Sequence, residues 1–477
     1  MKTKFWLALA VALPSALSAS GENWAVIVAG SRGYMNYRHQ ADVCHAYHLV
    51  RRNGIPSDRV ILMSYDDAAA SVDNPVRGSL YNKPTPAGVP GYDVYRGCKA
   101  SYVGQDVTAA NFMAVLTGDD VITGGKPVLR STSEDRVFVY FADHGAVGLV
   151  SMPVGEPLYA QDLVDTLVSM NEKKMYKELL LYVEACESGS MFKGLLPSDA
   201  NIYAVTAANS HESSYGTYCG EHSSVDGTVI GSCLGDLFSV NFLENSDVPQ
   251  LFQTETLDNQ FELLKNKTTL SHVKKFGTST MGVDPISWFQ GSMNFPSLQS
   301  QQGRELIHLL RYIRFFRRFG ERAPPSDPAS SAAVVDSRDI TLHTLQFQRS
   351  LAEGQSNSAE TTSSLDKAIT AELAERKQSD TLFWNIAHLV SGDMQEADKF
   401  FGGAIADGFT DHTCLKAANN AVIHTCGHYS DYSLKHVRVL ALLCEAGFGG
   451  DIIDAVHQVC GFMITGNPRE SNVMLTQ

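Results

Sequence analysis

Between Trp24 and Gly291, short apolar segments alternate with longer amphipathic ones, and this order restricts the fold more than any other feature. The short segments are rich in Val, Ile, Leu and aromatic residues, so we predict them as strands. The predicted strands are Trp24–Ala29, Val60–Met63, Val137–Ala142, Leu179–Val183 and Ile202–Thr206, and the predicted helices include Ala41–Asn53, Asp106–Leu116 and Ala160–Ser169. This alternation predicts an α/β fold with a mostly parallel sheet covered by helices on both faces. Ligands of such sheets bind beyond the carboxyl ends of the strands.

Two predicted strands end in residues that suit nucleophilic catalysis. Cys186 follows Leu179–Val183, and Asp143-His144-Gly145 follows Val137–Ala142. A thiol attacks a carbonyl when it is partly ionised and close to a base, so Cys186 would be the nucleophile and His144 its proton partner. Gly145 has no side chain, so its N–H would help that of Cys186 to bind an oxyanion. From strand position alone, an inert buried cysteine and a structural histidine are equally well supported.

Charged residues at the same predicted sheet edge suggest a specificity pocket. Glu184 lies two residues before Cys186, so both side chains point to the same side of an extended chain. Arg38 lies in a polar cluster that follows the first strand. An asparagine side chain needs a donor for its oxygen and an acceptor for its NH₂ group, which Arg38 and Glu184 would supply. A structural ion pair between these two residues is the alternative.

The N-terminus has the pattern of a secretory signal peptide over residues 1–20. Lys2 and Lys4 precede the apolar segment Phe5–Leu13, and Ala16–Ser20 offers small residues for cleavage. A short buried helix is the weaker alternative. No later apolar segment is long enough to span a bilayer. The net charge of −14 argues against nucleic acid as the main partner.

The nine cysteines imply several disulfides and at least one free thiol in an oxidising compartment. Cys219 and Cys233 flank a polar loop that a disulfide could close, and four more cysteines crowd the last 70 or so residues. We expect Cys44 to be a small buried residue on a helix, and Cys98 has no assignment. Asn266 begins a glycosylation sequon.

Four motifs resemble the legumain family, also known as asparaginyl endopeptidases or vacuolar processing enzymes. They are Asn36–Tyr47 (NYRHQADVCHAY), Phe141–Gly145 (FADHG), Glu184–Ser190 (EACESGS) and Ala207–Ser214 (AANSHESS). The resemblance covers the whole mature chain, is strongest over residues 24–292, and is closest to plant-type members around Cys219 and Cys233. It implies a caspase-like α/β/α peptidase domain that cleaves after Asn and, at acid pH, after Asp.

The resemblance also implies a role for each matching residue. Cys186 would be the nucleophile, with His144 as its partner and Asn36 orienting the histidine. The asparagine pocket would be lined by Arg38, His39, Glu184, Ser213 and Asp236. Asp143 would be the aspartate that forms a succinimide in some members. Gly216 would set the balance between hydrolysis and peptide ligation. A small residue at this position is compatible with either reaction.

The C-terminal part is similar to the prodomain of the family, an all-α, death-domain-like unit that inhibits the peptidase. The implied domains are a peptidase at residues 21–292, an activation peptide at 293–340 and a prodomain at 341–477. The implied disulfides are Cys414–Cys444 and Cys426–Cys460, and the candidate activation sites are Asn294, Asp327, Asp336 and Asp339. A basic helix at Leu306–Arg318 would cross the active site, unless it is an ordinary surface helix. Protonation of carboxylates in an acidic vacuole or lysosome would weaken its docking.

Two other functions share parts of this pattern. The catalytic subunit of the glycosylphosphatidylinositol transamidase has the Asn-Tyr-Arg-His cluster, but it usually carries a C-terminal membrane anchor. A binding module without turnover is the second alternative, which the intact Cys186 and His144 disfavour. We expect no cofactor and no metal, because the three-residue spacing of His45 and His48 is weak evidence for a metal site.

Overall fold

The computed structural model describes residues 21–248, 252, 254–291, 334–353, 359–405 and 409–465. Its core is a six-stranded sheet in the order β13-β8-β7-β3-β1-β2. The strands are β1 (Asn23–Ala29), β2 (Val60–Met63), β3 (Arg136–Ala142), β7 (Glu178–Glu184), β8 (Ile202–Thr206) and β13 (Lys274–Gly277). All neighbours pair in parallel except β13, which is antiparallel to β8 at the edge. The predicted strands and the mostly parallel sheet are confirmed.

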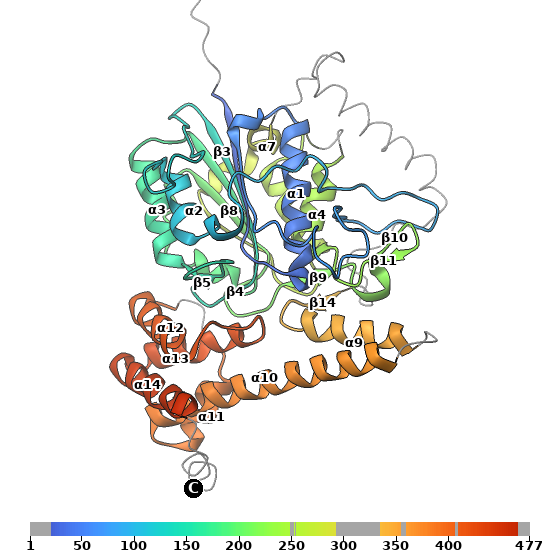
Figure 1. Cartoon of the computed structure of the whole chain (residues 1–477). Coiled ribbons are helices and arrows are strands. Elements are labelled where there is room, and N and C mark those ends of the chain that lie inside the picture. Colours follow the sequence, from blue (N-terminus) through green and yellow to red (C-terminus); the bar gives the residue numbers. More distant parts are fainter. Residues whose placement is uncertain are drawn as a thin grey trace, which may run out of the picture.

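Helices cover both faces of this sheet (Figure 1). One face carries α2 (Ala109–Thr117) and α3 (Ala160–Glu172), and the other carries α1 (Tyr37–Arg52), α4 (Leu237–Ser246), α6 (Leu257–Lys267) and α7 (Ser287–Gln290). Alternate residues of β1 serve the two faces, since Val26 and Val28 pack on the first and Ala25 and Ile27 on the second. These layers make the α/β/α sandwich of the predicted fold class.

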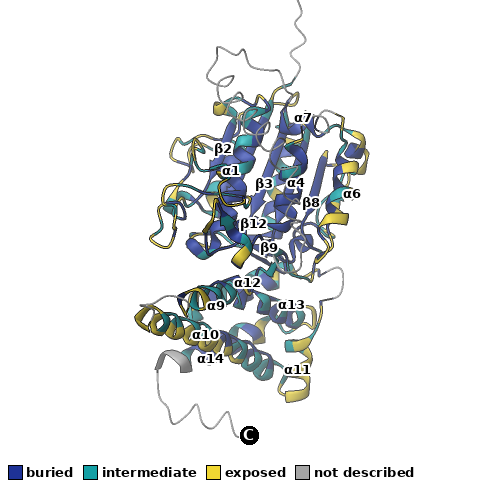
Figure 2. Cartoon of the chain, turned by 90° about the vertical axis from the view of Figure 1, so that its right-hand side faces the viewer, coloured by how far each residue is buried: buried dark blue, intermediate teal, exposed yellow. Residues whose placement is uncertain are grey.

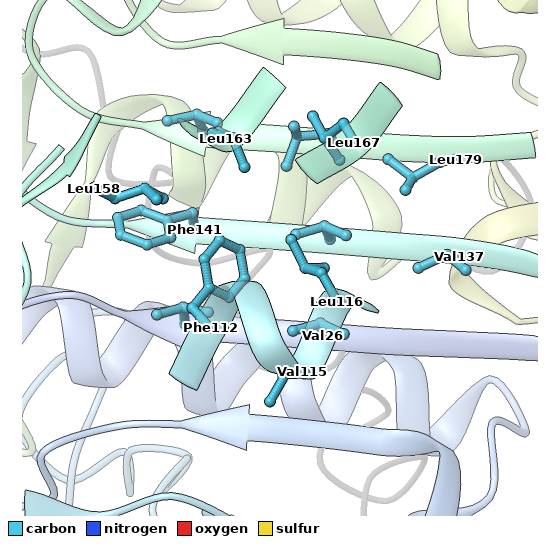
Figure 3. Packing of buried hydrophobic residues seen from close by; sticks show 14 of the residues in the cluster. Val26, Phe112, Val115, Leu116, Val137, Phe141, Leu158, Leu163, Leu167 and Leu179 are labelled. Carbon is cyan, nitrogen blue, oxygen red and sulfur yellow. The ribbon is translucent and has the colours of Figure 1, made fainter. Parts of the chain in front are cut away.

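The α2–α3 face shows how the sheet is held together. Phe112 and Leu116 of α2 and Leu163 and Leu167 of α3 point at the strand residue Phe141 and its neighbours (Figure 3). Full burial of one such side chain stabilises the fold by about 1.5–3 kcal/mol. Thr108 caps α2 by accepting a hydrogen bond from the Asn111 N–H, and Gly118 ends it in the left-handed conformation.

Short strands extend the carboxyl end of the sheet. They are β4 (Gly145–Ala146), β5 (Leu149–Val150), β6 (Leu158–Tyr159), β9 (Tyr215–Thr217), β10 (Ser224–Val225), β11 (Thr228–Val229), β12 (Gly235–Asp236) and β14 (Val335–Asp336). In the three-stranded sheet β12-β9-β14, the last strand comes from far along the chain. The C-terminal segment therefore pairs with β9, in a small sheet that is separate from the six-stranded one.

The C-terminal part is all-helical, as predicted. It consists of α9 (Ile340–Glu353), α10 (Ala359–Ser391), α11 (Met394–Gly402), α12 (His412–Cys426), α13 (Val437–Glu445) and α14 (Gly449–Thr465). Its helices lie against the end of the sheet that carries β4, β5 and β9 (Figure 1). Leu149 and Tyr159 belong to the same apolar cluster as the helical core, so the two parts share packing. Figure 2 shows that buried residues concentrate in the sheet, whereas much of α10 is exposed.

The structure contains four disulfides. Cys219–Cys233, Cys414–Cys444 and Cys426–Cys460 are the three named above. The fourth, Cys44–Cys98, corrects the expectation that Cys44 is an unpaired buried residue. It joins α1 to the irregular segment 64–100, whose lack of periodicity gave no sign of where Cys98 would lie. Cys186 is left as the free cysteine.

Several sequence predictions concern other parts of the chain. The signal peptide at residues 1–20, the basic helix at 306–318, and Asn294 and Asp327 lie outside the described residues. Asn266 lies in the last turn of α6 and is exposed. Among the described residues, no helix has both the length and the apolar character needed to cross a membrane.

Candidate active site

The candidate catalytic residues lie at the carboxyl ends of three adjacent strands. His144 follows β3, Cys186 follows β7, and Asn36 leads into α1 after β1. The strand pairing extends to the site, because the Asp143 N–H donates to the Glu184 carbonyl at 3.0 Å. Parallel strands bring these separate sequence segments to one edge of the sheet.

Asn36 fixes the orientation of the His144 ring. Its Nδ2 donates to the carbonyl of Arg32 at 3.1 Å, so its Oδ1 faces His144 Nε2 at 2.8 Å. An acceptor at that distance requires the proton on Nε2. His144 Nδ1 then carries the lone pair, and this buried atom has no hydrogen-bond partner within the described part of the chain. The free lone pair is what a general base needs.

Cys186 is fully buried beside β9. Its Sγ accepts a hydrogen bond from the Ser214 N–H at 3.3 Å and lies 3.7 Å from Ser214 Oγ. Burial raises the pKa of the thiol to about 11, although nearby Arg338 opposes this shift. The described contacts contain no hydrogen bond between Cys186 and His144. The thiol is therefore protonated in this arrangement.

Gly145 packs tightly against the nucleophile segment. A Cβ atom on Gly145 would lie 2.4 Å from the Cys186 carbonyl oxygen and 2.9 Å from Ala185 Cβ. Such distances exclude any side chain without movement of the backbone. The close approach keeps the Gly145 backbone beside the place where a carbonyl would be attacked, and its oxyanion role stays a prediction.

Three buried charged residues, Arg38, Glu184 and Asp236, form a cluster at the predicted position of the asparagine pocket. Arg38 Nε donates to Asp236 Oδ1 at 2.8 Å, and Glu184 Oε2 accepts from the N–H and hydroxyl of Ser239 at 2.9 and 3.0 Å. Burial raises the pKa of Glu184 well above its usual range, and nearby Asp236 adds to the shift. Arg38 Nη2, Glu184 Oε1 and Asp236 Oδ2 have no hydrogen-bond partners among the described residues. When both carboxyl groups are ionised, the cluster therefore has one unused donor and two unused acceptors.

The other predicted pocket residues have different surroundings. His39 Nδ1 bonds to Ser31 Oγ at 2.6 Å, and its Nε2 lies 3.4 Å from Asp236 Oδ2, so His39 contacts the charged cluster through Asp236. Ser213 hydrogen-bonds the carboxyl of Asp336. Gly216 lies in β9, where an added Cβ would come within 2.6 Å of Ile340 Cδ1. Asp143 is buried directly before His144.

The C-terminal part covers the site. Strand β14 pairs with β9, and the Ser337 N–H donates to the Ser214 carbonyl at 3.1 Å. Arg338 Nη2 donates to Glu187 at 2.8 Å and to the Gly145 carbonyl at 2.5 Å. Asp431 Oδ2 lies 3.3 Å from His144 Nε2. A cavity of about 440 Å³ remains between the two parts, lined by His144 and Asp431 among others.

Sequence reasoning missed four residues that contact the site. Ser239 bonds Glu184, Ser214 bonds the thiol, Asp42 Oδ2 accepts from the Asp236 N–H at 3.0 Å, and Asp431 contacts His144. Ser214 and Asp42 lie inside the quoted motifs, so their positions in the sequence could have identified them as candidate site residues. Nothing in the sequence marks Asp431, because it reaches the site only through the packing of the helical part.

Comparison with known proteins matches two family models. Residues 23–292 match the Peptidase C13 family, and residues 367–460 match the legumain prodomain. The vacuolar-processing enzyme delta-isozyme of Arabidopsis thaliana is 37% identical over 93% of this chain and 91% of its own length. Legumain of Bos taurus is 38% identical over 92% of this chain and 93% of its own length. A caspase-1 structure from Spodoptera frugiperda aligns over 54% of this chain and 87% of its own, with 9% identity and a TM-score of 0.33.

Proposed function

The chain belongs to the peptidase C13 family and is a cysteine endopeptidase with a legumain prodomain, and we propose that it cleaves peptide bonds after asparagine. The prodomain match favours this function over a transamidase subunit. The domain division that we propose is a peptidase at residues 21–292, an activation peptide at 293–340 and the prodomain at 341–477. Helix α9, which begins at Ile340, supports the last boundary.

The observation that carries this proposal is the set of unpaired atoms in the pocket. Arg38 Nη2 offers a donor, and Glu184 Oε1 and Asp236 Oδ2 offer acceptors. A carboxamide has one acceptor oxygen and two N–H donors, so it would pair with all three. An ionised aspartate would face two carboxylates, whereas a protonated aspartate supplies one donor and is accepted better. The pocket therefore favours Asn, and Asp at acid pH.

The geometry supports a conventional acyl transfer. His144 Nδ1 takes the proton of the Cys186 thiol, and the sulfur attacks the main-chain carbonyl carbon of the bound asparagine itself. The oxyanion forms near the backbone N–H groups of Gly145 and Cys186. The peptide C–N bond then breaks, and His144 returns the proton to the leaving amine. Water releases the acyl group in hydrolysis, and an incoming amine releases it in ligation.

In the form described here the enzyme is latent. The segment Val335–Arg338 lies over the nucleophile, and Asp431 contacts the histidine. A substrate needs the same β9 edge, so the C-terminal part must leave before peptides can bind. We place the active enzyme in an acidic vacuole or lysosome, because the relatives are vacuolar-processing enzymes and legumains. Its substrates would be proteins with exposed asparagines.

One experiment tests this function. Purified protein is incubated at about pH 5, where self-processing and cleavage of matched peptides with Asn, Gln or Asp at the test position are followed by mass spectrometry. We expect cleavage after Asn, less after Asp and none after Gln. Cys186→Ala should be inactive, and Ser133→Ala, at an exposed surface site, should be unaffected. Equal activity of Cys186→Ala and wild type, or cleavage after Lys, would contradict the proposal.

A further inference from the structure

Three potential metal ligands, one of them the candidate base His144, lie together in the catalytic centre. One ligand atom each from His39, Asp143 and His144 lies within 4.8 Å of the other two. All three residues are at most 2% exposed. The two imidazole rings are nearly perpendicular, with centroids 5.1 Å apart, and His39 Nδ1 lies 3.6 Å from Asp143 Oδ1.

Buried polar atoms of these residues that lack a hydrogen-bond partner in the described part of the chain indicate that a ligand could bind here. Both carboxylate oxygens of Asp143 and the Nδ1 of His144 are buried without a hydrogen-bond partner among the described residues. Buried polar groups of this kind cost free energy unless something pairs with them. The carboxylate of Asp236 beside His39 Nε2 favours a proton on that nitrogen, which leaves the lone pair of His39 on Nδ1. That lone pair accepts a hydrogen bond from the Ser31 hydroxyl at 2.6 Å, so an ion would displace this bond when the two imidazoles and the carboxylate converge on it.

This ligand set matches the preferences of zinc. Zinc takes imidazole nitrogen and carboxylate oxygen at about 2.0–2.2 Å, and three protein ligands with an open fourth position are common. In a tetrahedron with such bonds the ligand atoms are roughly 3.3–3.5 Å apart, so ring movements of about 1 Å would close the set. Asn36 and Asp236 would serve as the outer partners that orient the two imidazoles.

An ion has a route to these residues. Asp143 and His144 line the interdomain cavity of about 440 Å³, and so does Ser31, whose hydroxyl bonds His39 Nδ1. The cavity would also supply water for the fourth position. His45 and His48 take no part, because His45 bonds Asn82 and Asp247 and His48 bonds the Val94 carbonyl.

We propose that His39, Asp143 and His144 form a zinc-binding site that inhibits the peptidase. Zinc on His144 Nδ1 occupies the lone pair that would accept the thiol proton. The ion therefore blocks the base without needing the Cys186 sulfur as a ligand. Because the three residues come from α1 and the end of β3, the site does not depend on the C-terminal part.

Zinc binding can be measured apart from activity. The full chain carrying Cys186→Ala can neither process itself nor offer a thiolate to zinc. Titration calorimetry should find one zinc ion per chain in this background. Adding His39→Ala or Asp143→Ala should weaken binding at least tenfold. The matched controls His272→Ala and His424→Ala remove histidines whose side chains are 73% and 65% exposed, and they should leave the affinity unchanged.

X-ray absorption on the zinc-loaded Cys186→Ala chain keeps the test valid if a ligand variant fails to fold. It should show two imidazoles and oxygen ligands at about 2.0–2.1 Å. Zinc should also inhibit the wild-type enzyme, and a chelator should restore activity. Fewer than two imidazoles, unchanged affinity in both ligand variants, or zinc-bound enzyme with full activity would overturn the proposal.

Discussion

At the scale of single residues, the proposed preference for asparagine depends on the pairing of Glu184. Its Oε2 is held by the Ser239 N–H, so in Glu184→Gln the side-chain NH₂ must face either that N–H or the substrate amide. Both arrangements oppose donor to donor. We expect kcat/KM for an Asn peptide to fall about 100-fold, and the ratio of Asp to Asn cleavage at pH 7 to rise.

Matched Asn and Asp peptides with a common flanking sequence would measure both effects. Glu178→Gln is the control, because Glu178 lies at the other end of β7 and pairs with Arg136. Unchanged Asn cleavage in Glu184→Gln would show that the carboxamide binds elsewhere.

Gly216 links the substrate edge to latency at the same scale. A methyl group there would lie 2.6 Å from Ile340 Cδ1, while the other near atoms, Cys233 Sγ and Arg38 Cδ, are at 3.3 and 3.4 Å. Gly216→Ala should therefore push Ile340 away and speed self-activation several-fold, as followed by the appearance of processed chain on gels. In an Ile340→Ala background the same substitution should have little further effect. Equal acceleration in both backgrounds would mean that Gly216 acts on the pocket and not on Ile340.

At the scale of elements, strand β14 pairs with strand β9, where we propose that a substrate binds. Val335 pairs with Gly216, and the Ser337 N–H donates to the Ser214 carbonyl. Ser214 also donates to the Cys186 sulfur, so the Ser337 backbone lies next to the nucleophile. The Ser337 hydroxyl lies 3.4 Å from Ser214 Oγ, and we expect the longer asparagine side chain to extend toward Arg38 and Glu184. Ser337→Asn should convert this strand into a substrate, with cleavage before Arg338 at least tenfold faster than in wild type at about pH 5.

Mass spectrometry would identify the new N-terminus at Arg338. Ser337→Ala should behave as wild type, and Ser337→Asn combined with Cys186→Ala should stay intact. A Ser337→Asn chain that remains whole would place the strand out of substrate register.

Elements with strong periodicity could be predicted, and contacts between distant segments could not. The main strands were predictable because their apolar residues form continuous runs, and the strand ends then brought Cys186, His144 and Arg38 to one edge. Helix α1 begins at Tyr37, four residues before the predicted start at Ala41. The prediction missed the first turn because its polar residues do not show the apolar periodicity of a helix. Cys44–Cys98, Asp431 and the pairing of β14 depend on how separate segments pack, which local sequence does not encode.

At the scale of the whole molecule, acid does not weaken every contact of the C-terminal part. Burial raises the pKa of Glu187 to about 7, although Arg338 opposes the shift. Burial also raises the pKa of Asp336. His144 holds the pKa of Asp431 at about 2 against the effect of burial, so protonation breaks that contact only below about pH 4. The expected weakening by acid concerned the basic helix at 306–318, which lies outside the described residues, and it stays a prediction; the contacts of Glu187 and Asp431 are a separate case.

The pH dependence of docking should follow Glu187. A glutamate in water has a pKa of about 4.3, and we take this value for Glu187 when the segment 335–340 has left. The docked pKa of about 7 is higher, so docking takes up a proton. The contribution of Glu187 to the free energy of docking is complete below about pH 4.3 and is lost as the pH rises through 7. In the full Cys186→Ala chain, hydrogen-exchange protection of residues 335–340 should rise at least about tenfold from pH 7.5 to 5.

Glu187→Gln should flatten this rise, while Glu212→Gln, at an acidic residue outside the Arg338 contact, should keep it. If residues 335–340 of the Cys186→Ala chain were less protected from hydrogen exchange at pH 5 than at pH 7.5, docking would release a proton and not take one up. That result would contradict the prediction. If the rise is found, acid alone cannot free the active site. Release in an acidic compartment would then require cleavage of the chain or charges outside the Arg338–Glu187 contact.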